Sequence, residues 1–196
     1  MKAGAGWRFD TAAGLDELRY RRIGRNELAT IGACETYAAA QKAYAATGHD
    51  GKPAGLYAQQ FASDPGKHNG LYWDTTPGEP ESPLGPLAAE AAAEGYRRST
   101  GTPAPFRGYF FRILTAQGPA AEGGAKSYLV GGDMRGGFAL VAFPAEYGKS
   151  GVMTFLVDQS GVVRQKDLGP DTAKTAGAMT AYDPDSAWTP AGGQGQ

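Results

Sequence analysis

The segment from residue 108 to residue 167 constrains the fold more than any other, because short apolar runs alternate there with glycine-rich turns. Runs of this kind joined by tight turns form hairpins, so the segment predicts an antiparallel meander. The first run is continuously aromatic and aliphatic, which is typical of a central strand that is buried on both faces. The predicted strands are Tyr109–Thr115, Ser127–Val130, Gly137–Phe143, Val152–Val157 and Val162–Asp167.

A helical pattern precedes this sheet, from about Asp16 to Ala46. We expect Gly24 to interrupt the pattern and Asn26 to cap a new start, so the long helix is predicted over residues 26–46. Gly48 follows as a typical helix terminator. At helical spacing, the face of small and apolar side chains that packs on the sheet consists of Ile31, Cys34, Tyr37 and Ala38.

Residues 49–86 form a long loop rich in proline and glycine. Because exposed aromatic side chains in a disordered linker favour aggregation, we expect this loop to be ordered with Trp73 buried. A short helix over Leu84–Glu94 follows, and a short C-terminal helix is expected over Thr172–Ala181, with Trp188 docking after it. The chain is therefore predicted to be α+β, with a long N-terminal helix packed on an antiparallel meander sheet.

We expect a single domain over residues 15–190 and a disordered tail over residues 191–196. Residues 1–14 are predicted to be either a stub of a missing upstream domain or a strand added to the main sheet. The segment Gly6–Asp10 alternates like a strand. Since no hairpin partner is expected nearby, the pattern favours the first of these interpretations.

Charge and cysteine content argue against several classes of protein. The chain has 19 Lys and Arg against 20 Asp and Glu and no basic stripe, so no nucleic-acid partner is expected. No apolar run approaches the ~20 residues needed to cross a bilayer, so no membrane span is predicted. One cysteine and two histidines suit neither a disulfide nor a zinc or iron site, so we expect no metal and no cofactor.

Two segments resemble catalytic motifs. Gly148-Lys149-Ser150 ends like a phosphate-binding loop, but the glycine required five positions earlier is replaced by Phe143, and two predicted strands flank the segment. It is therefore predicted to be a hairpin turn. A nucleophilic Cys34 would need a helix N-terminus or a neighbouring cation, whereas its position in the middle of a helix predicts a small buried hydrophobe.

His68, Tyr72, Trp73 and Asp74 are the candidate ligand-binding residues. In a binding site, the aromatic rings would stack on a small molecule or glycan while the polar groups orient it. In the alternative interpretation the loop is structural and His68 bonds to backbone. The second interpretation is favoured, because no second carboxylate lies at a spacing that supports glycoside hydrolysis. No catalytic residue is assigned.

Six segments form a recognisable set of motifs: Gly6–Thr11, Arg22–Leu28, Gly66–Trp73, Glu79–Pro86, Gly108–Ala120 and Gln165–Thr172. Together they resemble a bacterial family of exported proteins catalogued as domain of unknown function twenty-nine fifty. The family has no assigned activity. Because its members usually begin with a signal peptide and another small domain, the resemblance implies a periplasmic or extracellular location, with this chain as the C-terminal domain.

A second resemblance is looser. The chain has a Tyr- and Ala-rich helix, then an irregular stretch, then a sheet that ends in residues 152–164. This order of elements is similar to that of the soluble domains of type IV pilin and pseudopilin-like proteins. It implies a pilin-like fold. Filament membership does not follow, because residues 16–30 are charged where pilins need an apolar helix with an anchoring carboxylate.

These observations predict a non-catalytic domain of the cell envelope that binds a partner or supports an assembly. The expected partner is an envelope protein or a cell-wall component. The alternative is an enzyme or receptor that acts on a cell-wall or carbohydrate ligand through the loop His68–Asp74.

Overall fold

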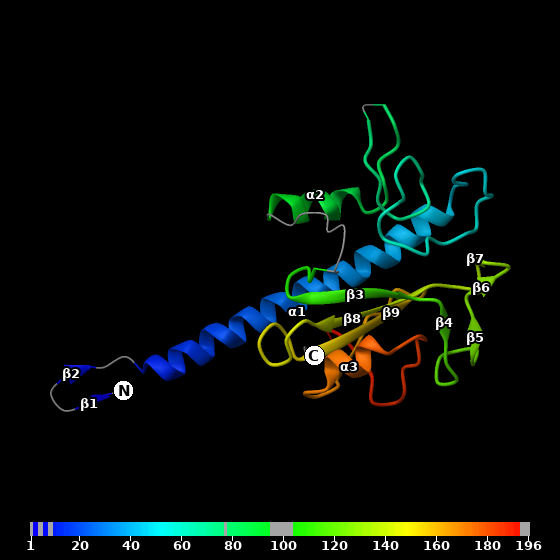
Figure 1. The fold of residues 1–196 in the computed structure, drawn as a ribbon. Coiled ribbons are helices and arrows are strands. Elements are labelled where there is room, and N and C mark those ends of the chain that lie inside the picture. The colour runs from blue at the N-terminus through cyan, green and yellow to red at the C-terminus, as the bar shows by residue number, and fades with distance from the viewer. Residues whose placement is uncertain (1, 4–5, 8–9, 77, 95–103, 193–196) are drawn as a thin grey trace.

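The computed structural model describes residues 2–3, 6–7, 10–76, 78–94 and 104–192. A five-stranded sheet lies between helix α1 on one face and helix α3 on the other (Figure 1). The helices are α1 (Thr11–Ala45), α2 (Gly85–Ala93) and α3 (Thr172–Gly177). The strands are β1 (Lys2–Ala3), β2 (Gly6–Trp7), β3 (Tyr109–Leu114), β4 (Ala116–Gln117), β5 (Lys126–Ser127), β6 (Leu129–Val130), β7 (Asp133–Met134), β8 (Ala139–Pro144), β9 (Met153–Asp158), β10 (Arg164–Asp167) and β11 (Thr189–Pro190).

The main sheet is an antiparallel meander with the strand order β11-β10-β9-β8-β3, as the turn pattern predicted. Strands β8 and β9 form its centre, and most of their side chains are buried. The α+β prediction is confirmed, and Trp188 is buried as expected. Strand β11, which no sequence pattern indicated, pairs with β10 through Arg164↔Pro190 and Gln165↔Thr189.

Two predictions about strands are wrong. The run Tyr109–Thr115 was expected at the centre, but β3 lies at the edge of the sheet. The strand is apolar because both of its faces are near helices: α1 and α2 lie toward one face, and α3 lies toward the other. Within the sheet, however, only β8 pairs with it. The run Ser127–Val130 is not one strand of this sheet. It divides into β5, which pairs with β4, and β6, which pairs with β7.

Helix α1 is longer than predicted, because Gly24 does not interrupt it. A glycine inside a helix costs roughly 1 kcal/mol but keeps its backbone N–H, so the hydrogen-bond ladder continues. The helix begins at Thr11, after Asp10 Oδ1 accepts a hydrogen bond from the Ala13 N–H at 3.1 Å. The helix thus includes residues 11–14, which were expected to precede the domain. Its N-terminal part extends away from the sheet (Figure 1).

Asn26 does not cap a helix, because it lies inside α1. Its side-chain amide donates to the Ser150 carbonyl at 2.8 Å. One carboxylate oxygen of the adjacent Glu27 accepts from the backbone N–H groups of Val152 and Met153, at 2.9 and 3.0 Å. These bonds fasten the middle of α1 to the β8–β9 turn and to the start of β9.

The C-terminal half of α1 packs on β8 and β9 with the predicted face. Cys34, Tyr37 and Ala38 are buried, Ile31 is half-buried, and the Tyr37 hydroxyl donates to the Ala139 carbonyl at 3.2 Å. Gln41, on the same face, is fully buried. Because small side chains allow close approach, the helix lies directly against the sheet.

The N-terminal segment does form a hairpin. Gly6–Trp7 pairs antiparallel with Lys2–Ala3, so the expectation that no hairpin partner lay nearby is wrong. The rest of the predicted strand at residues 8–9 lies outside the described residues, as does most of the predicted tail, at residues 193–196. Within that tail, the Ala191 N–H donates to the Val163 carbonyl at 2.8 Å.

Candidate functional site

The long loop is ordered over its described residues, and Trp73 is buried with 8% of its surface exposed, as predicted. The Trp73 ring stacks on the ring of His68 at a centroid distance of 4.5 Å and lies 5.7 Å from that of His49. His49 in turn stacks on Tyr44 of α1 at 4.0 Å. This row of rings attaches the loop to the end of α1.

The backbone of His68 is held on both sides. Its N–H donates to Asp50 Oδ2 at 2.9 Å, and its carbonyl accepts from the Tyr44 hydroxyl, also at 2.9 Å. Burial raises the pKa of Tyr44, with the nearby Asp50 carboxylate adding to the shift. The His68 side chain itself is exposed apart from its contact with Trp73.

The structure brings Tyr72, Trp73 and Asp74 to the wall of one open hollow of about 470 Å³, in front of α2. His68 does not line this hollow. The Tyr72 hydroxyl donates to Asp74 Oδ1 at 2.9 Å, so these two polar groups point at each other. Three of the four candidate residues therefore share one hollow, whereas His68 lies outside it.

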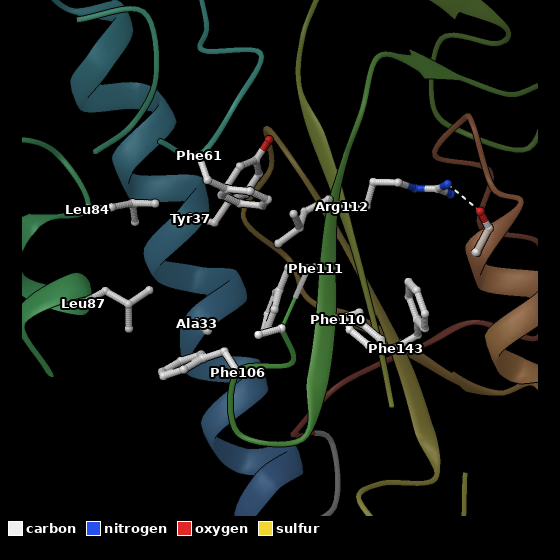
Figure 2. A pocket seen from close by; sticks show the side chains of 13 residues that line it. Ala33, Tyr37, Phe61, Leu84, Leu87, Phe106, Phe110, Phe111, Arg112 and Phe143 are labelled. Atoms are coloured by element: carbon white, nitrogen blue, oxygen red, sulfur yellow. Dashed lines mark hydrogen bonds between the residues drawn. The ribbon is translucent and has the colours of Figure 1, made fainter. Parts of the chain in front are cut away.

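A larger cavity, of about 640 Å³, runs along the edge strand β3. We call it the β3 groove. Figure 2 shows that its lining residues come from separate parts of the chain: α1, the long loop, α2, the segment before β3, the strands β3 and β8, and the end of α3. Apolar side chains form nearly all of the wall, and the principal ones are Phe61, Leu84, Leu87, Phe106, Phe111 and Phe143.

Among the described residues that line the groove, Arg112 is the one with a charged side chain at neutral pH. Its guanidinium points away toward α3 (Figure 2). There it donates to the backbone carbonyls of Ala176, Gly177 and Met179. Ala176 and Gly177 lie in the last turn of α3, and Met179 follows its C-cap, so the cation sits at the helix end that the dipole makes negative. The two terminal nitrogens of Arg112 are thus hydrogen-bonded at the end of α3, and the guanidinium is directed away from the wall formed by α1 and α2.

Sequence reasoning missed the β3 groove. Its residues are far apart in the chain, and each has an ordinary explanation as part of a core. One signal was present: Tyr109–Thr115 is more apolar than an edge strand of a soluble protein usually is. That pattern indicated apolar neighbours on both faces of the strand. It could not show whether one or both edges of the strand are hydrogen-bonded to neighbouring strands.

The two motif-like segments are structural, as predicted. Gly148-Lys149-Ser150 lies in the turn between β8 and β9, where Lys149 pairs with Glu146 at 2.8 Å. Cys34 is fully buried, and burial raises the pKa of its thiol well above the usual range. A thiol in this environment stays protonated and is a poor nucleophile.

Other charged clusters lie at the surface. Lys52 Nζ contacts Asp133 Oδ1 at 2.7 Å, and the hydrogen bond from Lys52, followed by that from Arg135, holds the pKa of Asp133 below its usual range. Within the described part of the chain, no group of three or more His, Cys, Asp or Glu side chains is arranged to hold a metal ion. Among the same residues, no helix is both long enough and apolar enough to span a membrane.

Comparison with known proteins gives the family. A family model described as "Protein of unknown function (DUF2950)" matches residues 1–191. The chain belongs to the DUF2950 family. The resemblance inferred from its motifs is therefore confirmed. No match was found for this DUF2950 chain among curated proteins or among solved structures. The resemblance to pilins stays a prediction.

Proposed function

We propose that this DUF2950 chain is a non-catalytic binding module of the cell envelope and that the β3 groove is its ligand site. The observation that carries the proposal is the groove itself. Its volume of about 640 Å³ lies within the range of about 300–1,000 Å³ that is usual for ligand pockets, and its wall is almost entirely apolar. Large exposed apolar surfaces of this kind mark interaction sites in soluble domains.

The chemistry of the wall supports binding rather than catalysis. General acid–base and nucleophilic catalysis need titratable or nucleophilic groups close to the reacting atoms. Among the described lining residues only Tyr37 and Arg112 carry such groups. The Tyr37 hydroxyl donates to the Ala139 carbonyl, and Arg112 donates to α3. Burial raises the pKa of Tyr37 well above its usual range, so its hydroxyl stays protonated.

Binding of Nile red, an uncharged apolar dye, tests the proposal. Leu87→Ser removes an apolar side chain from the wall that α2 contributes and should weaken dye binding at least fivefold, since about 1–2 kcal/mol of apolar contact is lost. The matched control is Leu15→Ser. Leu15 is 63% exposed on the projecting part of α1, so this variant should bind the dye like the wild type. Equal affinities of Leu87→Ser and wild type, with circular dichroism showing both folded, would refute the groove as the site.

The envelope location is proposed from the family resemblance. Fractionation of cells that express the full-length natural protein tests it. Recovery in the periplasmic or extracellular fraction is expected, and recovery with the cytoplasmic markers would contradict it.

A second candidate function is a receptor for a cell-wall or carbohydrate ligand at the loop His68–Asp74. The observation that favours it is the open hollow of about 470 Å³ beside Tyr72, Trp73 and Asp74. Titration with muropeptides and chitooligosaccharides, followed by tryptophan fluorescence, tests this candidate. It requires saturable binding that Asp74→Ala weakens and Leu87→Ser leaves unchanged.

A further inference from the structure

We infer, on the basis of the proposed function, that the β3 groove binds a short extended run of apolar residues from another protein. This peptide adds as a strand to the free edge of β3, at Phe111 and Ile113. The occupant is specified by backbone groups as well as by apolar side chains. An edge strand that offers unpaired N–H and C=O groups beside apolar pockets is the arrangement that recognises extended peptides.

The direction of the backbone groups of β3 follows from its hydrogen bonds. The Tyr109 N–H and C=O both bond to Phe106, on the side away from β8, at 2.9 and 2.8 Å. On the β8 side, the Gly108 carbonyl accepts from the Ala145 N–H at 2.9 Å. In an antiparallel pair, successive residues direct these groups to alternate sides. The N–H and C=O of Phe111 and Ile113 therefore point outward, away from β8.

This free edge is a short window with defined ends. At one end the edge is occupied by the bonds between Tyr109 and Phe106, and at the other the Thr115 carbonyl accepts from the Tyr128 N–H at 2.8 Å. Between them, no hydrogen-bond partner of the outward groups of Phe111 and Ile113 is found within the described segments. The window offers two N–H and two C=O groups, which suits a short peptide better than a whole second sheet.

Apolar side chains flank this window on both faces of the sheet. Figure 2 shows Phe111, Phe106 and Leu87 on the side of α1 and α2, and Phe110 with Phe143 on the side of α3. The side chains of an added strand alternate between the two faces. Consecutive apolar residues in the peptide would therefore be buried on both sides at once, which explains why the expected partner sequence is continuously apolar.

Amide hydrogen exchange measured by NMR tests strand addition directly. The probe is a peptide of four valines flanked by lysines, and its control is the same peptide with every interior amide N-methylated. In the free protein, the amides of Phe111 and Ile113 should exchange fast, while those of Phe110 and Arg112, which point toward β8, exchange slowly. Adding the peptide should slow exchange at Phe111 and Ile113 at least tenfold. The N-methylated control should bind at least tenfold more weakly, because it cannot donate to β3.

The outcomes separate this inference from the proposed function. If the peptide binds and Leu87→Ser weakens it, but exchange at Phe111 and Ile113 is unchanged, strand addition is refuted and the groove remains a binding site. If neither Nile red nor the peptide binds, the proposed function fails as well. Protection of both amides in the free protein that grows with its concentration would show that a second copy occupies the edge, and this would also overturn the inference.

Discussion

Gln41 provides the sharpest test of how the long loop is held. This side chain is fully buried in α1 and pairs with both backbone groups of Ala58: its Oε1 accepts from the Ala58 N–H at 2.9 Å, and its Nε2 donates to the Ala58 carbonyl at 2.8 Å. Nε2 also donates to the Tyr37 hydroxyl at 3.0 Å. The amide thus acts toward Ala58 as a neighbouring strand would.

Gln41→Leu keeps the size of the side chain but removes all three bonds. Ala58 is only 1% exposed, so its N–H and C=O would both lose their partner in a place that water does not reach freely. A buried polar group without a partner costs about 1–3 kcal/mol. Two such groups, partly offset by the burial of an apolar side chain, give an expected loss of about 3 kcal/mol in the free energy of unfolding. For a chain of this length, that loss lowers the melting temperature by roughly 6–12 °C.

Urea denaturation with tryptophan fluorescence measures the loss, provided that the slope of the transition stays the same. The matched control is Gln59→Leu in the same loop. Gln59 is exposed and donates only one bond, to the Gly132 carbonyl at 2.8 Å, so its replacement should change stability by less than about 1 kcal/mol. If Gln41→Leu is as stable as wild type, apolar packing alone holds the loop, and the reasoning from Ala58 is refuted.

Two further predictions concern buried side chains. Trp73→Ala should cost about 3–5 kcal/mol, as other large truncations in cores do, and an unchanged urea midpoint would instead favour a ligand-binding role for Trp73. Burial raises the pKa of the Cys34 thiol in the folded state, so the unfolded chain loses this proton first as the pH rises. The contribution of Cys34 to the free energy of unfolding is therefore fully present below about pH 8.5. Above that pH it falls by up to about 1.4 kcal/mol per pH unit. Urea titrations at pH 8 and pH 10 should show this fall in wild type and a smaller one in Cys34→Ala; identical losses would contradict it.

The sequence predicts the parts of this fold that have a local period. The buried face of α1, with Cys34 and Tyr37, follows from helical spacing, and the order β8, β9, β10 follows from turns between apolar runs. The continuation of α1 through Gly24 was missed, because helix propensity counts the cost of the glycine but not the bonds of Asn26 and Glu27 to residues more than a hundred positions away.

The candidate site was less accessible to the same reasoning. Tyr72 and Trp73 attract attention because two large aromatic residues are adjacent in a loop, and the structure accounts for Trp73 by its stacking on His68. The β3 groove has no local signature. Its wall forms only when the long loop and α2 pack beside the sheet edge, which brings together Phe61, Leu87 and Phe111.

Strand β3 shows how an apolar sheet edge can be kept from pairing along its whole length. Edge strands usually carry charged side chains that discourage pairing with other molecules, whereas the one charged residue of β3, Arg112, donates to the end of α3. In β3 the free part of the edge is short instead. Phe106 is hydrogen-bonded to the edge at Tyr109, and Tyr128 is hydrogen-bonded to it at Thr115. A window of two outward residues is too short to nucleate a sheet between molecules, yet it can fix the direction and register of a bound peptide. The continuously apolar sequence of β3, which suggested a central strand, is therefore the same feature on which the proposed binding surface depends.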